Sequence, residues 1–144
     1  MRIDGMDAIF APRSVAVIGA SSDPKRIGGR PVDFLRRHGF DGTILPINPK
    51  TSKVQGLTAY PSITEAPTTP DLAVIALPAR LAVQAVEDCA ARGVRGAVIF
   101  SSGFSEVNDE GAALQARMVD IAREGGMRLV GPNCLGIAKV RHNL

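Results

Sequence analysis

The segment SVAVIG, from Ser14 to Gly19, decides the fold class of this sequence. It is a continuous run of aliphatic residues that ends in glycine, and such short runs are typical of strands buried on both faces of a sheet. Four further segments repeat the form: Thr43 to Asn48 (TILPIN), Asp71 to Leu77 (DLAVIAL), Val94 to Phe100 (VRGAVIF) and Met127 to Gly131 (MRLVG). The sequence therefore predicts a sheet that contains these five segments as buried strands.

Segments with helical periodicity separate the predicted strands. From Arg80 to Arg92, and again from Asp109 to Glu124, apolar residues recur on one stripe while charged residues lie outside it. A further helix is expected from near Gly28 to Gly39, with Pro31 in its first turn and Gly39 as a left-handed C-terminal cap. Strands that alternate with helices predict an α/β fold, a Rossmann-like doubly wound parallel sheet in a single three-layer domain.

The segment from Val54 to Tyr60 is bounded by Lys53 and Pro61 and is expected to add a short edge strand. The expected strand order is then 3-2-1-4-5-6, with right-handed crossovers. A length of 144 residues suits one domain, so residues 1–144 are interpreted as a single domain. Residues 137–144 neither cap a helix nor close a strand, which favours the N-terminal part of a longer protein.

Composition and charge narrow the classes of function. Hydrophobic residues make up 45% of the chain and charged residues 22%, an ordinary globular balance, while 4% aromatic residues without Trp imply an aliphatic core. The 17 basic and 14 acidic residues give a net charge of +3. Because the basic residues are scattered along the sequence, a nucleic-acid partner is not indicated.

No segment is long and apolar enough to span a bilayer, so no membrane partner is expected. The first ten residues carry Asp4 and Asp7 in place of the apolar stretch of a secretory signal, which favours a cytoplasmic location. Cys89 and Cys134 form no CxxC pair and have no histidine at ligand spacing. They are interpreted as reduced thiols, and no metal site is expected.

The loop after the first strand, Gly19 to Gly28, is suited to phosphate. In a doubly wound sheet a ligand binds at the carboxyl ends of the strands, where the neighbours of the first strand diverge. The loop is not GxGxxG, because Ser21 stands where that fingerprint has its second glycine. Its backbone N–H groups, the hydroxyls of Ser21 and Ser22, and the cations Lys25 and Arg26 can hold phosphate oxygens. An ordinary polar loop is the alternative.

The other loops at this edge differ in character. Asn48-Pro49-Lys50 lacks the acidic residue that NAD-binding proteins place here, and a lysine suits the extra ribose phosphate of NADP or coenzyme A, unless it is merely a solvated surface lysine. Leu77-Pro78-Ala79 is expected to form an apolar wall. The loop from Ser101 to Glu106 has small residues, past which a narrow uncharged tail such as pantetheine can run; Phe104 either faces this tail or packs under its own loop.

Five pieces of the sequence occur in order between about Met6 and Ile137: SVAVIGASSDPKRIGG, PINPK, DLAVIALPA, GAVIFSSGFSE and LVGPNCLG. Together they resemble the N-terminal CoA-binding domain of NDP-forming acyl-CoA synthetases. This group includes ADP-forming acetyl-CoA synthetase and is related to the α subunit of succinyl-CoA synthetase. The specific part of the resemblance is NPK, followed by SSGFSE and then by GPNC-x-G. The first loop departs from the Thr-Gly type of the succinyl-CoA synthetase α subunit, so its contacts carry over only from the ADP-forming branch.

The resemblance implies a coenzyme A site in these loops and neither a catalytic residue nor a metal ligand in this domain. The loop after the first strand would hold the ADP part of CoA, and the Asn48-Pro49-Lys50 loop would hold the adenosine and its 3′-phosphate. The Leu77-Pro78-Ala79 loop would cover the adenine and the pantetheine. The loop that begins at Ser101 would guide the tail, and the last loop would lie near the thiol. The implied residues are Gly19, Ala20, Ser21, Ser22, Lys25, Asn48, Pro49, Lys50, Leu77, Pro78, Ala79, Ser101, Ser102, Gly103, Phe104, Asn133 and Cys134.

The function that the resemblance implies is that of a domain in an acid–CoA ligase, which holds the thiol of CoA, or of acyl-CoA, toward an acyl phosphate. The phosphorylated histidine of this family belongs to the following domain, so further domains or subunits of the ligase are expected as partners, and neither His38 nor His142 matches it. Cys134 is interpreted as a thiol that shapes the end of the tunnel rather than as a nucleophile.

Two alternative functions remain open. The first is a CoA-sensing regulatory domain of a protein-lysine acetyltransferase, or a free-standing CoA-binding protein. The second is an NADP-binding oxidoreductase domain, against which the absence of GxGxxG and of a Tyr-x-x-x-Lys motif stands.

Overall fold

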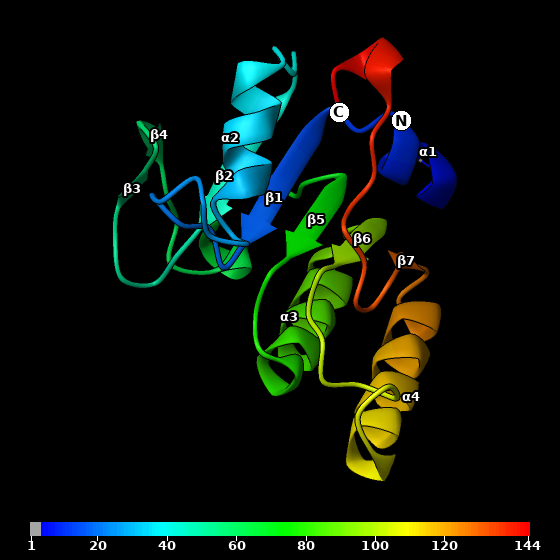
Figure 1. Cartoon of the computed structure of the whole chain (residues 1–144). Helices are drawn as coiled ribbons and strands as arrows, with labels where there is room; N and C mark the ends of the chain where they lie inside the picture. Colours follow the sequence, from blue (N-terminus) through cyan, green and yellow to red (C-terminus); the bar gives the residue numbers. More distant parts are fainter. Residues whose placement is uncertain (1–3) are drawn as a thin grey trace.

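Five parallel strands form the central sheet of the computed structural model, which describes residues 4–144 (Figure 1). The strands are β1 (Ser14–Ile18), β2 (Thr43–Ile47), β5 (Leu72–Ile75), β6 (Gly96–Ile99) and β7 (Arg128–Val130). They lie in the order β2-β1-β5-β6-β7, and every neighbouring pair is parallel. The five strands predicted from the apolar runs are confirmed, each shorter than its run because the last residues of the run belong to the following loop.

Helices cover both faces of the sheet and give the predicted three layers. The helices α1 (Gly5–Phe10) and α2 (Arg30–Arg37) pack on one face, and α3 (Ala79–Arg92) and α4 (Asp109–Glu124) pack on the other (Figure 1). Within residues 4–144, no helix has the length and apolar character needed to cross a membrane. The Rossmann-like doubly wound fold is therefore confirmed.

Local signals explain where the helices begin and end. Pro31 lies in the first turn of α2, and Gly39, with a φ of 70°, follows its last turn, as predicted. The side chain of Asn108 caps α4 by accepting a hydrogen bond from the Gly111 N–H at 2.8 Å. The six-residue helix α1 was not expected from the sequence, although Asp4 caps it by accepting from the Met6 N–H at 2.7 Å.

The prediction of an edge strand from Val54 to Tyr60, and with it the strand order 3-2-1-4-5-6, is wrong except at Tyr60, which forms an isolated parallel bridge with Ile47 of β2. This part of the chain forms a separate antiparallel hairpin of two-residue strands, β3 (Lys53–Val54) and β4 (Leu57–Thr58). Gln55 and Gly56 between them have φ values of 48° and 82°, which is the backbone that a tight two-residue hairpin turn requires. The short 3₁₀ helix η1 (Ile63–Glu65) follows the hairpin. Because the hairpin strands form a sheet of their own, β2 is the edge strand of the main sheet.

After β7 the chain returns across the sheet face that carries α2. Residues 131–144 run along this face and end in the 3₁₀ helix η2 (Val140–His142), drawn in orange and red in Figure 1. Ile137 and Leu144 pack against the same buried cluster as Val15 and Leu35. This segment and α2 therefore lie on either side of the face that β1 and β5 present.

Candidate functional site

Each of the five parallel strands is followed by a loop at the carboxyl edge of the sheet, and each loop is named here after the strand that it follows. Neighbouring loops contact one another in the spatial order of the strands, from β2 through β1, β5 and β6 to β7. Asn48 Nδ2 donates to the Ala20 carbonyl at 2.9 Å, which joins the β2 and β1 loops. Across the switch point, a Cβ placed on Gly19 would lie 3.0 Å from Leu77 Cδ2. The β5 and β6 loops meet where a Cβ on Gly103 would lie 3.4 Å from Ala79 Cβ.

The β6 and β7 loops complete this row, because the Asn133 N–H donates to the Ser101 carbonyl at 2.9 Å. The structure therefore brings all five predicted loops into one continuous edge.

The β1 loop is closed at its base by two glycines. Gly19 has a φ of 86°, which favours glycine. A Cβ on Gly28 would collide with the Gly19 carbonyl, so the two ends of the loop can approach this closely only because residue 28 is glycine. The Ser21 N–H donates to the Gly28 carbonyl at 3.3 Å across this base. Within the loop the Asp23 N–H donates to Ser21 Oγ at 3.1 Å, and the Lys25 N–H to Asp23 Oδ1 at 2.9 Å. The second glycine of the dinucleotide fingerprint is thus replaced by a longer, internally braced loop.

Some polar groups of the β1 loop are free to hold an anion. Among residues 4–144, the N–H groups of Ser22, Ile27 and Gly28 have no protein acceptor. The side chains of Ser22 and Lys25 are exposed to solvent. Backbone donors with a nearby cation, ahead of a helix N-terminus, form the kind of site that holds phosphate oxygens.

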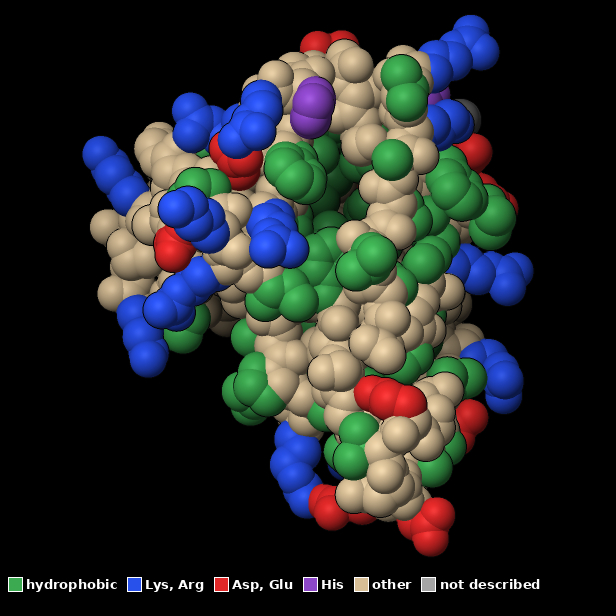
Figure 2. All heavy atoms as spheres, viewed as in Figure 1, with side chains coloured by type: hydrophobic (Ala, Val, Ile, Leu, Met, Phe, Trp, Pro, Cys, Tyr) green, Lys and Arg blue, Asp and Glu red, His purple; other side chains and the backbone are tan. Residues whose placement is uncertain are grey.

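Positive charge gathers in space at one end of the edge, although it is scattered along the sequence. Figure 2 shows Lys and Arg side chains grouped over α2, the β1 loop and the β3–β4 hairpin. The basic residues of these segments and of the β2 loop are Lys25, Arg26, Arg30, Arg36, Arg37, Lys50 and Lys53, of which Arg26 and Arg37 form ion pairs with Asp23 and Asp33. The β6 and β7 loops at the other end present small or uncharged residues, from Ser101 to Phe104 and at Asn133 and Cys134.

The β2 loop is ordered by Asn48. Besides its bond to Ala20, its side chain accepts from the Lys50 N–H at 2.7 Å, and its own N–H donates to the Tyr60 carbonyl at 2.9 Å. Asn48 is half-buried, whereas Pro49 and Lys50 are exposed. Asn48 therefore positions the backbone of this loop, and the Lys50 ammonium group is accessible to a ligand.

Gln55, which is not among the site residues predicted from the sequence, connects the hairpin to the β1 loop. Its Nε2 donates to the carbonyls of Ser21 and Gly29, both at 2.9 Å. Both ends of the predicted phosphate loop are therefore tied to one side chain. The available signal was the Gln55-Gly56 pair, which marks a turn but does not reveal what the turn contacts.

The β6 loop is braced by Glu106. Its carboxylate accepts from the N–H groups of Gly103 at 2.6 Å and Phe104 at 3.1 Å. These bonds, with the Gly103 N–H first, lower the pKa of Glu106 from its ordinary value of 4.5. The Phe104 ring is fully buried, so it packs under its own loop, and its backbone is the part that lies at the edge.

Buried and exposed serines alternate at the start of this loop. Ser101 is buried, and its Oγ has no hydrogen-bond partner among residues 4–144, whereas Ser102 is exposed. On the β5 loop, Leu77 is half-buried and Pro78 is exposed. The apolar side chains expected to form a wall therefore lie partly open to solvent at the edge.

The two cysteines differ in environment. Cys134 is half-buried at the edge, and its Sγ donates to the Ile99 carbonyl at 3.4 Å. Burial, and then the charge of Asp88, raise the pKa of Cys89 to about 12, which leaves that thiol unreactive. In residues 4–144, no group of three His, Cys, Asp or Glu side chains is placed to hold a metal ion.

Comparisons with known proteins agree with this geometry. A family model described as "CoA binding domain" matches residues 13–139. The chain is similar to the α subunit of ADP-forming acetate–CoA ligase II of Pyrococcus furiosus, with 41% identity over 139 residues, covering 96% of this chain and 30% of that protein. It is also similar to ADP-forming acetate–CoA ligase I of Archaeoglobus fulgidus, with 44% identity over 132 residues, covering 92% of this chain and 19% of that protein.

A solved structure has the same fold over nearly the whole chain. It is the dinucleotide-forming acetyl-coenzyme A synthetase 1 of Ca. Korarchaeum cryptofilum in complex with phosphate and ADP, with a TM-score of 0.92 and 36% identity. The alignment covers 99% of this chain and 30% of that one. The chain therefore spans less than a third of the length of these relatives.

Proposed function

The chain belongs to the family of CoA-binding domains, and from this premise we propose that it is the CoA-binding domain of an ADP-forming acid–CoA ligase. The observation that carries the proposal is the polarity of the carboxyl edge, which carries cations at the β2 and β1 loops and has no charged side chain from Ser101 to Phe104 or at Asn133 and Cys134. Coenzyme A has the matching polarity, with phosphates at its nucleotide end and a thiol at the end of an uncharged tail.

The residues present fit such a ligand. The free N–H groups of the β1 loop, with Lys25, suit the diphosphate, and the exposed Lys50 suits the 3′-phosphate. Asn133 and Cys134 mark the thiol end, beside the last residue of β6. The remaining predicted residues of the five loops shape the path between these two ends.

The chemistry proposed for this domain is positioning. CoA, when bound, supplies the thiol that takes up the acyl group. The chain's own loops fix the direction of that thiol, which lowers the entropic barrier of the transfer without a catalytic base in this domain. The acyl phosphate and its phosphorylated histidine are proposed to come from further domains or subunits, and the short share of the relatives that this chain covers supports that arrangement.

The proposal treats residues 1–144 as one domain at the N-terminal side of such a ligase, in the cytoplasm. The cations around the β1 and β2 loops are assigned to the phosphates of CoA, so no nucleic-acid partner is proposed for them. An acetyltransferase-linked sensor would bind CoA at the same edge, and the sequence beyond this domain would separate it from a ligase.

Calorimetric titration of the 144-residue chain with CoA, dephospho-CoA, NADP and NAD, at one ionic strength, tests the proposal. CoA is expected to bind more tightly than dephospho-CoA, and NADP and NAD are expected to give no signal. Binding of NADP without CoA would favour an oxidoreductase domain instead. Absence of heat with all four ligands would contradict the proposal that this chain holds CoA by itself.

Lys50→Ala tests the position of the 3′-phosphate. A charge-assisted hydrogen bond contributes about 1.5–3 kcal/mol, so the variant is expected to weaken CoA about tenfold to hundredfold and to leave dephospho-CoA unchanged. Lys139→Ala, on the C-terminal segment, is the matched control and should alter neither affinity. An equal loss for CoA and dephospho-CoA would place Lys50 away from the 3′-phosphate.

A further inference from the structure

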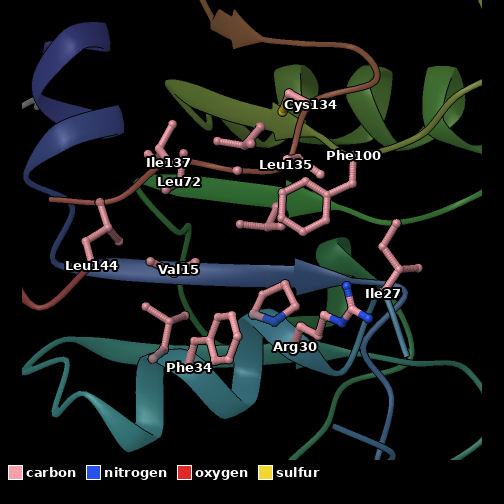
Figure 3. Close-up of a pocket in the computed structure, with 15 residues that line it drawn as sticks. Val15, Ile27, Arg30, Phe34, Leu72, Phe100, Cys134, Leu135, Ile137 and Leu144 are labelled. Atoms are coloured by element: carbon pink, nitrogen blue, oxygen red, sulfur yellow. The ribbon is translucent and has the colours of Figure 1, made fainter. Parts of the chain in front are cut away.

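A cavity opens beside the carboxyl edge, on the sheet face that carries α2 (Figure 3). Its volume is about 400 Å³, within the range of small-molecule pockets. Val74 and Val98 of the sheet form its floor, Phe34 and Leu35 of α2 form one wall, and the segment from Cys134 to Ile137 forms the other. Figure 2 shows the opening as a hollow lined by hydrophobic side chains. None of the residues assigned to CoA lines it except Cys134.

The cavity begins at the proposed thiol end and runs inward along the strands. Phe100 and Cys134 lie at the carboxyl end of β6, while Leu72 lies at the first residue of β5. Leu72 is level with Gly96 in the register of these strands, and Phe100 is four residues farther along. At about 3.3 Å per residue the cavity extends about 13 Å along the sheet, which suits a chain of about eight carbons.

The inside of the cavity suits hydrocarbon. Of the residues from 4 to 144, Arg30 is the one with a charged side chain in the lining, and in Figure 3 this side chain lies near the carboxyl end of β1, at the mouth rather than in the depth. The floor valines are buried and apolar, so the side chains of the floor offer water no hydrogen-bond partners. Leu135, fully exposed, and Ile27, 56% exposed, extend the apolar lining outward at the mouth. An apolar chain thus has a continuous apolar path from the edge to the floor.

We propose that this cavity receives the acyl group of an acyl-CoA, with the thioester beside Cys134 and a chain of about eight carbons lying over β5 and β6. The inference rests on the proposed function, because it takes the thiol end of CoA to lie at Asn133 and Cys134. It adds a substrate class, acids with an extended apolar chain, and makes the cavity the element that selects for chain length.

Affinities of CoA, acetyl-CoA, butyryl-CoA, hexanoyl-CoA and octanoyl-CoA for the unmodified chain provide the first test. Full burial of a methylene group strengthens binding about fourfold, and partial burial about twofold. Octanoyl-CoA is therefore expected to bind at least about tenfold more tightly than acetyl-CoA, with no further gain once the chain exceeds the cavity. Equal affinities across the series would overturn the inference.

Val74→Phe tests whether the gain in affinity from a longer acyl chain arises in this cavity. Val74 lies on the cavity floor, and the larger phenylalanine ring fills the space. The variant is expected to lose the gain from octanoyl-CoA while its affinity for CoA stays within about twofold. Val119→Phe, a partly exposed position on α4 at the opposite face, is the matched control and should keep the gain. A Val74→Phe protein that folds and keeps the full gain would contradict the assignment.

Alkylation of Cys134 in the unmodified chain gives a readout that does not depend on a core substitution. Octanoyl-CoA at saturation is expected to slow alkylation of Cys134 by iodoacetamide at least about tenfold more than saturating acetyl-CoA, because the longer acyl chain covers the Cys134 thiol and neither thioester has a free thiol that consumes the reagent. Equal protection by both ligands would argue against the cavity. If CoA binds and the acyl chain changes nothing, the inference alone fails; if CoA does not bind at all, the proposed function fails and the inference with it.

Discussion

Replacement of Gln55 by leucine tests whether the β3–β4 hairpin holds the β1 loop in place. The Gln55 amide donates to the carbonyls of Ser21 and Gly29, both at 2.9 Å and both partly buried. Leucine has a similar volume but no donor, so Gln55→Leu removes both bonds and leaves two carbonyls less well solvated than in the unfolded chain. The φ of 48° at this position is equally unfavourable for glutamine and for leucine, so it does not contribute to the difference between them.

The expected loss of stability follows from the two bonds. A net contribution of about 0.5–1.5 kcal/mol for each hydrogen bond gives a lower free energy of unfolding by about 1–3 kcal/mol, and we expect about 2 kcal/mol. For a chain of this size that corresponds to a fall in Tm of roughly 6–8 °C. The affinity for CoA should fall as well, because Ser21 and the free N–H groups of the loop lose their fixed positions.

Urea denaturation followed by far-UV circular dichroism measures the effect, and Gln84→Leu is the matched control. The Gln84 amide donates to Asp88 Oδ1 at 3.1 Å, but on the exposed face of α3 and one turn away. Such a pair contributes about 0.2–0.5 kcal/mol, so the control should be nearly as stable as the unmodified chain. If Gln55→Leu costs no more than Gln84→Leu, the hairpin does not hold the loop.

Two further predictions concern ionisable side chains. The pKa of Glu106 is lowered from 4.5 by the N–H of Gly103, so the stability contributed by its carboxylate is complete above pH 4.5 and fades as the pH falls below it. The difference in urea midpoint between the unmodified chain and Glu106→Gln should therefore shrink below pH 4.5, and a difference independent of pH would refute this. Because the pKa of Cys89 is raised to about 12 by burial, a thiol reagent at about pH 8 should modify only Cys134 in the native chain, as peptide mass spectrometry can establish.

The sheet could be predicted from the sequence because its strands are buried on both faces. A strand such as β5 has four consecutive buried residues, so its sequence is a continuous apolar run that no amphipathic helix would have. The limits of α2 followed from Pro31 and Gly39, whose backbone preferences act locally. The segment from Val54 to Tyr60 was mistaken for a strand of the same sheet, because its apolar residues resemble an edge strand and the turn at Gln55 divides it.

The site was predictable in outline and not in detail, for a related reason. Parallel strands place all their following loops at one edge, so topology alone brings the β1 loop near the β2 loop. Which atoms then meet depends on tertiary packing. The contact of Gln55 with Ser21 spans 34 positions, and the burial of the Phe104 ring depends on how α4 packs on the sheet. Neither is encoded in local spacing.

The cavity shows most clearly what a sequence pattern leaves open. Along the chain, Val74 and Val98 are indistinguishable from core residues, because a strand that faces a cavity needs the same apolar side chains as a strand that faces a helix. On this face α2 contacts β2, and α1 contacts β6 and β7, so the surface over β5 depends on residues 131–144 for cover. The hollow between that segment and α2 is a property of the arrangement, not of any one segment. Because this hollow lies beside Cys134, where we propose that the thiol of CoA lies, it is suited to an apolar acyl chain attached to that thiol.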